Sequence, residues 1–156
     1  MVRVCTRHGH QRGAAYFWAL MLVLFISLGI GKLLNNVVKT NQRAREADLL
    51  YIGNLYKEAI RQYAQSTPTG TMPYPEQLED LLRDPRYPVT RRYLRRLYPD
   101  PITGRSFATI PAPGGGVKGV HSVSTRAPVK VAGFPPGEEV FASAQSYQQW
   151  EFSYTP

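Results

Sequence analysis

AAYFWALMLVLFISLGIG, residues 14–31, is the stretch that decides the fold, because it carries no charged residue and only one small polar one, Ser27. An α-helix of about 20 apolar residues crosses the ~30 Å hydrocarbon core of a bilayer. The eighteen residues of this stretch are close to that length. The whole chain has a mean hydropathy of −0.31, so only one segment is membrane-like. The stretch therefore predicts a single transmembrane helix.

The helical pattern continues beyond this stretch. The first 67 residues contain no proline, whereas all thirteen prolines lie from Pro68 onward. Proline in a helix interior costs ~3 kcal/mol, so the chain divides into one long helix and one turn-rich head. Between residues 33 and 63 apolar residues recur at steps of three and four, which indicates an amphipathic helix. We expect a transmembrane helix over 14–34, an amphipathic extension over 35–66 and a head over 67–156.

The segment before the apolar stretch predicts the orientation of the chain. Residues 1–13 contain Arg3, Arg7 and Arg12 but no acid. The positive-inside rule then places this leader in the cytoplasm and the head on the far side of the membrane. A secretory signal peptide is the alternative, but its apolar region would be shorter and followed by a small-x-small cleavage site. The only cysteine, Cys5, lies in the leader, so no disulfide is expected within the head.

The head is expected to be α+β. Helical spacing bounded by prolines predicts two short helices, over 75–83 and over 90–98. Alternating apolar and polar residues and intervening turn residues predict a short antiparallel sheet. Its expected strands are residues 106–110, 117–123, 129–134 and 150–154, and in the last one Trp150, Phe152 and Tyr154 share one face.

No set of catalytic or metal-binding residues stands out in the head. His121 and Ser122 offer a base and a hydroxyl, but neighbouring residues on a strand point to opposite faces. The acidic residues do not follow the spacing of a calcium loop, and no Cys/His set suits zinc. We therefore expect a non-enzymatic protein without cofactor or metal. A membrane-anchored periplasmic enzyme that uses His121 or Ser122 is the alternative.

The charge distribution predicts one binding surface. The chain has a net charge of +8, and residues 85–105 contain six arginines and one acid. The helix expected over 90–98 would place four arginines on one face and four apolar or aromatic residues on the other. We expect the arginine face to bind an acidic protein; a DNA-binding surface and a solvated face paired with the acids of residues 76–84 are the alternatives. The four arginines are Arg91, Arg92, Arg95 and Arg96, and the opposite face holds Tyr93, Leu94, Leu97 and Tyr98.

Together these features resemble the type IV pilin family: a charged leader ending in glycine, an apolar helix directly after it, an amphipathic extension and a small head. Within that family the head is most similar to pseudopilin-like proteins of type II secretion systems. The closer resemblance is carried by Tyr74-Pro75-x-x-Leu78-x-x-Leu81-Leu82-x-Asp84, by Arg91 to Tyr98 followed by x-Asp100-Pro101-x-Thr103-Gly104, by Gly119-Val120-x-Ser122-x-Ser124, by Gly133-Phe134 and by Tyr147-x-x-Trp150-x-Phe152.

The resemblance implies a processing site and a set of partners. Family members are cut by a prepilin peptidase after the leader glycine, which matches Gly13 and makes Ala14 the new N-terminus. The residue that follows the cut is usually Phe and the fifth is usually Glu, whereas this chain has Ala14 and Trp18. The implied partners are the bilayer and other pseudopilin or secretion-system subunits, in the bacterial inner membrane with the head in the periplasm. A basic minor pilin that binds DNA is an alternative within the family.

Overall fold

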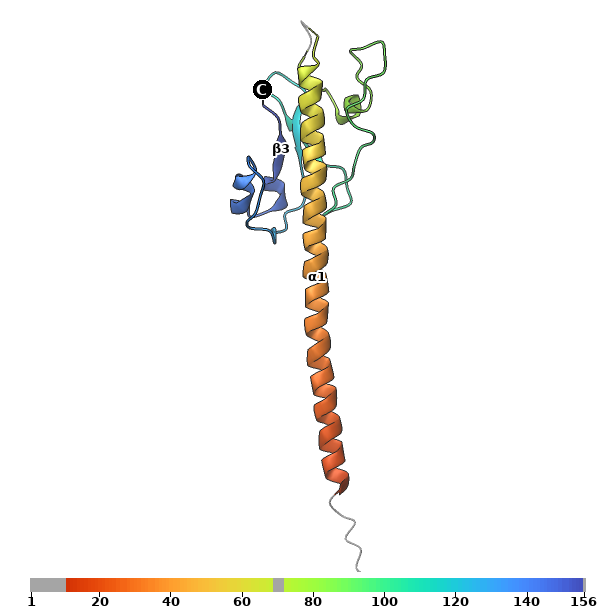
Figure 1. Cartoon of the computed structure of the whole chain (residues 1–156), viewed down its shortest axis with the longest axis vertical. Helices are drawn as coiled ribbons and strands as arrows, with labels where there is room; N and C mark the ends of the chain where they lie inside the picture. The colour runs from red at the N-terminus through yellow and green to blue at the C-terminus, as the bar shows by residue number, and fades with distance from the viewer. Residues whose placement is uncertain (1–10, 69–71, 156) are drawn as a thin grey trace, which may run out of the picture. The chain divides into compact units, whose positions relative to one another are not determined.

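The computed structural model of the chain describes residues 11–68 and 72–155, and for residues 11–14 and 28–38 it describes only the backbone. Most of the leader therefore lies outside the described residues. The fold is α+β with a short antiparallel sheet, as predicted, and the sheet has three strands (Figure 1). Its elements are the helix α1 (Gln11–Gln65), the short 3₁₀ helices η1 (Leu78–Leu81), η2 (Glu139–Ser143) and η3 (Tyr147–Gln149), and the strands β1 (Ala108–Pro111), β2 (Val117–His121) and β3 (Glu151–Ser153).

The chain divides into two compact units, residues 1–41 and residues 42–156. In the first unit, the large apolar side chains described along α1 from Tyr16 to Ile26 are exposed, except for Met21, which is partly buried. The Ser27 hydroxyl donates to the Val23 carbonyl one turn earlier, so it is satisfied within the helix. Among the residues that the structure describes, no helix combines the length and the apolar character needed to cross a membrane.

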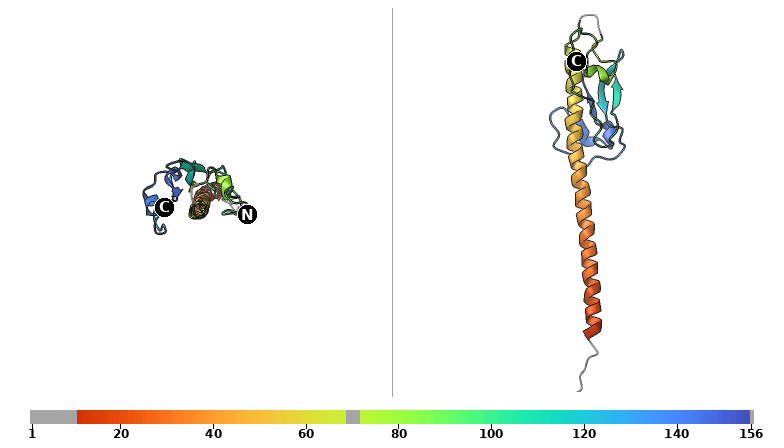
Figure 2. Two further views of the ribbon diagram at one scale, coloured as in Figure 1. Left: turned by 90° about the horizontal axis from the view of Figure 1, so that it is seen from above. Right: turned by 90° about the vertical axis from the view of Figure 1, so that its right-hand side faces the viewer.

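The second unit, called the C-terminal unit below, packs one face of α1 against the sheet (Figure 2). The helical stripe expected from the sequence is buried there: Leu49, Tyr56 and Ile60 are at most 1% exposed. Gly53 lies on the same stripe, and a Cβ atom built on it would lie 2.4 Å from the Phe152 ring. Glycine therefore allows β3 to approach the helix more closely than a larger residue would.

The strand order is β1-β2-β3, and both pairings are antiparallel. Val120 on the central strand is fully buried and pairs with Thr109 on one side and Phe152 on the other. Three of the four predicted strands are thereby confirmed with bounds shifted by a few residues. The strand predicted over 129–134 is wrong, because the amides of Val129 and Lys130 donate to the Glu46 carboxylate on α1 and not to a neighbouring strand.

The two short helices predicted for the head are also corrected. The helix expected over 75–83 is reduced to η1, and residues 90–98 form no helix. Backbone groups within residues 90–98 form hydrogen bonds with residues 81 and 84 and not with one another. The amides of Tyr93 and Leu94 donate to the Leu81 carbonyl, and the Arg91 carbonyl accepts from the Asp84 amide. These bonds use groups that a helix would need for its own ladder.

Candidate partner-binding surface

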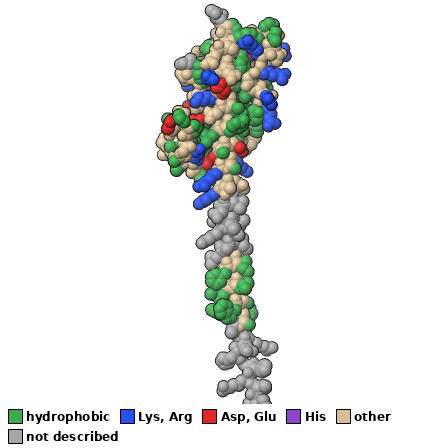
Figure 3. Space-filling model, in the orientation of Figure 1, with side chains coloured by type: hydrophobic (Ala, Val, Ile, Leu, Met, Phe, Trp, Pro, Cys, Tyr) green, Lys and Arg blue, Asp and Glu red, His purple; other side chains and the backbone are tan. Residues whose placement is uncertain are grey.

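Residues 91–96, called the arginine segment below, present their charges to solvent. All four arginines predicted to form a surface are exposed, whereas Leu94 between them is only 6% exposed. Tyr93 and Leu97 are partly buried against the core. The expected separation of arginines from apolar side chains is therefore confirmed, although an irregular segment and not a helix produces it. Figure 3 shows lysine and arginine side chains along the edge of the C-terminal unit that corresponds to this part of the chain.

The side chains of the four arginines make no hydrogen bond or ion pair with any residue that the structure describes. Two of them lie over aromatic rings: the Arg91 guanidinium is 4.2 Å from the centroid of Tyr87, and that of Arg96 is 5.0 Å from the centroid of Tyr98. The ion pairs between these arginines and the acids of residues 76–84, which one alternative required, are not formed. Four exposed guanidinium groups are thus available to an anionic partner.

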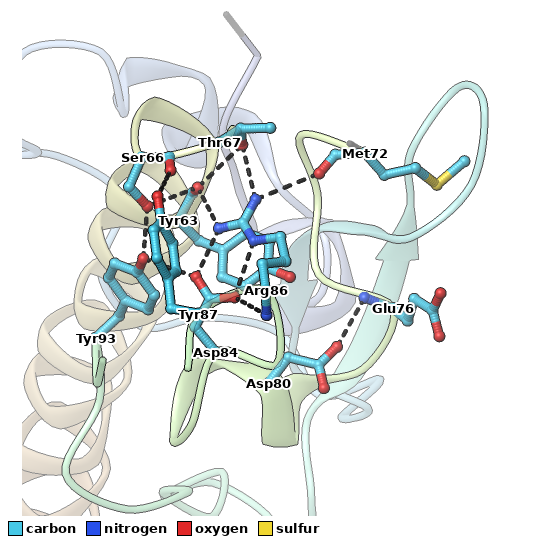
Figure 4. A network of polar contacts seen from close by, with 10 residues as sticks. All are labelled: Tyr63, Ser66, Thr67, Met72, Glu76, Asp80, Asp84, Arg86, Tyr87 and Tyr93. Atoms are coloured by element: carbon cyan, nitrogen blue, oxygen red, sulfur yellow. Dashed lines mark hydrogen bonds and ion pairs between the residues drawn. The ribbon is translucent and has the colours of Figure 1, made fainter. Parts of the chain in front are cut away.

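A buried ion pair fixes the start of this surface (Figure 4). The carboxylate of Asp84, which is 1% exposed, accepts from Arg86 Nε at 2.9 Å and from Arg86 Nη2 at 2.8 Å. It also accepts from the Tyr93 hydroxyl at 2.9 Å. Asp84 therefore links the chain before the arginine segment to a residue inside it. Arg86, although counted among the six arginines of this region, faces inward and adds nothing to the exposed charge.

The Arg86 guanidinium also caps the C-terminal end of α1. Its Nη2 atom donates to the Tyr63 carbonyl at 2.9 Å, and its Nη1 atom donates to the Thr67 hydroxyl at 2.8 Å. The last carbonyls of a helix have no partner within the helix and carry the negative end of its dipole, so a cation is favourable there. The guanidinium lies 3.5 Å from the centroid of the Tyr63 ring, which adds a cation–π contact.

The network shifts the acid–base behaviour of its members. Burial alone would raise the pKa of Asp84, but the hydrogen bonds from Arg86 and Tyr93 outweigh it and hold the pKa below its ordinary value. Burial raises the pKa of Tyr63 to about 12. Near pH 7 the Asp84 carboxylate therefore stays ionised, as its ion pair with Arg86 requires, and the Tyr63 hydroxyl stays neutral.

A second buried carboxylate, Asp100, fixes the other end of the arginine segment. It is fully buried and accepts from the Ile102 amide at 2.9 Å, from the Thr103 hydroxyl at 2.7 Å and from the Ser122 hydroxyl at 2.7 Å. Gly104 has a φ of 73°, which glycine adopts without strain. The Asp-Pro-x-Thr-Gly sequence thus forms a turn tied to the end of β2.

The remaining candidate residues do not join this surface. Ser122 is fully buried and its hydroxyl donates to Asp100, while His121 Nδ1 contacts the Ser122 carbonyl oxygen at 2.9 Å. The pair is therefore not arranged as a base and its nucleophile. Gly13 and Ala14 lie in the first turns of α1, where only the backbone is described. The described residues contain no group of three or more potential metal ligands.

Two sets of buried polar contacts were not predicted from the sequence. One is the Asp84–Arg86 pair. The other is Glu46, which is 1% exposed and accepts hydrogen bonds from the Tyr147 hydroxyl at 2.7 Å and from the Val129 amide.

Comparisons with family models, curated proteins and solved structures find no match for the chain.

Proposed function

We propose that the chain is a non-enzymatic, pseudopilin-like membrane protein of a bacterial type II secretion or type IV pilus-type assembly. In this proposal the N-terminal part of α1 is a single transmembrane helix in the inner membrane, and the C-terminal unit lies in the periplasm. The protein acts by packing its helix against other helices and by binding partner subunits through the arginine segment. It contributes to protein secretion without turning over a substrate.

The observation that carries the proposal is the apolar surface of α1 over residues 15–27. Leu22, Val23, Leu24, Phe25 and Ile26 are consecutive and each is more than half exposed. Five consecutive residues of an α-helix point in all directions around its axis. A helix that is apolar all round is stable when it is surrounded by lipid or by other apolar helices.

The C-terminal unit supports the same proposal from the other end of the helix. It is small, has one sheet packed on α1, and holds its exposed arginines between two buried carboxylates, Asp84 and Asp100. A surface held in one conformation loses little entropy when a partner binds. The alternative of an enzyme that uses His121 or Ser122 is disfavoured by the burial of the Ser122 hydroxyl against Asp100.

Membrane fractionation combined with mass spectrometry of the purified protein tests the proposal. We expect the full chain to resist alkaline extraction from the inner membrane and to begin at Ala14. Val23→Arg should weaken membrane retention, because a central arginine costs about 2.5–3.5 kcal/mol on insertion scales. Ala47→Arg is the matched control, since Ala47 lies on an exposed position of the same helix in the C-terminal unit. Extraction of the parent chain at high pH would contradict the anchor, and an intact Met1 would contradict the processing.

A further inference from the structure

A cavity with carboxylates in its lining lies between α1 and β3. It has a volume of about 390 Å³. Its charged lining residues are Lys57, Glu138 and Glu151, which leaves one net negative charge. Phe141 and Phe152 form an apolar part of its lining. A ligand with a cationic end and an apolar stem matches this combination.

Glu138 is the residue that marks the cavity as a binding site. It is 5% exposed, and its Oε1 atom accepts from Asn54 Nδ2 at 2.7 Å. Its Oε2 atom is buried and has no hydrogen-bond partner among the described residues. A buried carboxylate oxygen without a donor is costly, so a bound guanidinium that donates to it would be stabilised.

The arginine segment supplies a suitable cation. Arg91 and Arg96 lie over tyrosine rings of their own chain, but among the residues that the structure describes no such contact or ion pair holds Arg92 or Arg95. We propose that Arg92 or Arg95 of one copy binds in the Glu138 cavity of a second copy of this chain. This inference rests on the proposed function, because it names the chain itself as a partner of its arginine segment.

The two surfaces lie on opposite flanks of α1 within the C-terminal unit. In Figure 1 the green chain that follows η1 runs along one flank, and the blue chain around η2 and β3 runs along the other. Figure 2 shows the same separation from above. Complementary patches on opposite flanks give a head-to-tail contact, which repeats from copy to copy and does not close after two. The contact therefore builds a row of copies.

Disulfide cross-linking of the full chain in membranes tests this contact. Val89, close to the arginine segment, and Val140, in the cavity lining, are 76% and 75% exposed, so cysteines there leave the charged residues unchanged. In a Cys5→Ser background, Val89→Cys combined with Val140→Cys should give a ladder of linked copies. Equal amounts of the two single variants should give dimers only. Val89→Cys with Val131→Cys is the matched control, because Val131 is 67% exposed but does not line the cavity.

Charge reversal then identifies the groups involved. Arg92→Glu with Arg95→Glu should lower the cross-linked yield at least about tenfold, since like charges would meet at the cavity. Adding Glu151→Arg, at an exposed position, should restore a large part of the yield. A ladder that survives the arginine reversal, or a Val89→Cys chain that dimerises with itself, would overturn the inference. Membrane retention of the same samples reports separately on the proposed function, so a retained chain without a ladder refutes only the row of copies.

Discussion

Replacing Asp84 by asparagine should destabilise the C-terminal unit far more than the small change in side-chain size suggests. The substitution keeps the shape of the side chain but removes the charge that faces the Arg86 guanidinium 2.8 Å away. The Arg86 side chain is only 9% exposed, so water cannot replace the lost partner. Arg86 would remain buried against the end of α1 without a counter-ion.

The magnitude follows from the burial of the pair. Removing one partner of a buried ion pair typically costs about 3–5 kcal/mol. The amide oxygen of asparagine can still accept hydrogen bonds from Arg86, so we expect the lower end of this range, about 3 kcal/mol. For a domain of about 100 residues, each kcal/mol shifts the unfolding temperature by about 4–8 °C, so a loss of about 3 kcal/mol should lower it by about 12–24 °C.

The same substitution should also remove a pH dependence. The pKa of Asp84 is lowered in the folded protein, mainly because hydrogen bonds from Arg86 outweigh the effect of burial. Its contribution to stability is therefore present above the ordinary aspartate pKa near 4 and is lost as the pH falls through the lower, folded value. The parent should lose stability over this acidic window more steeply than Asp84→Asn does.

Thermal unfolding of the full chain in detergent, followed by near-ultraviolet circular dichroism from pH 7 to pH 2, measures both effects. Asp48→Asn is the matched control, because Asp48 is exposed on the same unit. The reasoning is refuted if Asp84→Asn unfolds within a few degrees of the parent at pH 7. It is equally refuted if parent and variant lose stability in parallel as the pH falls.

Three further predictions concern the packing of the same unit. Gly53→Ala should lower the unfolding temperature, because the added Cβ would lie 2.4 Å from the buried Phe152 ring and overpacking costs about 1–3 kcal/mol. This cost should exceed the ~1 kcal/mol by which alanine favours a helix over glycine. An equal or higher unfolding temperature would contradict this. Glu46→Gln should speed hydrogen exchange of the Val129 amide roughly tenfold, because a hydrogen bond to a charged acceptor is weakened. Unchanged exchange would show that the Glu46 carboxylate does not hold this amide. Leu94→Ala should cost about 2–5 kcal/mol in urea unfolding, since the side chain is 6% exposed, and a loss below about 1 kcal/mol would show that the segment is not anchored by it.

The sequence predicts the main elements of the fold because their signals are local. The lack of proline before Pro68 and the apolar stripe predict the long helix, and the alternation at Trp150, Phe152 and Tyr154 predicts β3. The helix expected over 90–98 fails for the opposite reason. Its spacing is helical, but the Leu81 carbonyl takes two of its amides as hydrogen-bond donors. Bonds of this kind depend on the tertiary structure and leave no mark on local spacing.

The candidate surface was predicted in part. The exposure of the four arginines follows from charge alone, whereas the hydrogen bond from Arg86 to the Tyr63 carbonyl joins residues 23 positions apart and leaves no mark on local spacing. Glu46 did leave a signal. It lies three and four residues before Leu49 and Leu50, on the buried stripe of α1, where a carboxylate requires a donor from another part of the chain.

The short sheet bears on how the C-terminal unit avoids aggregation at high local concentration. Unpaired strand edges are templates for aggregation, and proteins protect them by keeping edge strands short or by placing proline there. Among the described strands, β1 has four residues and ends at Pro111, which has no amide to donate, and β3 has only three residues. Neighbouring copies therefore have little edge to extend, and this disfavours amyloid-like stacking at high local concentration.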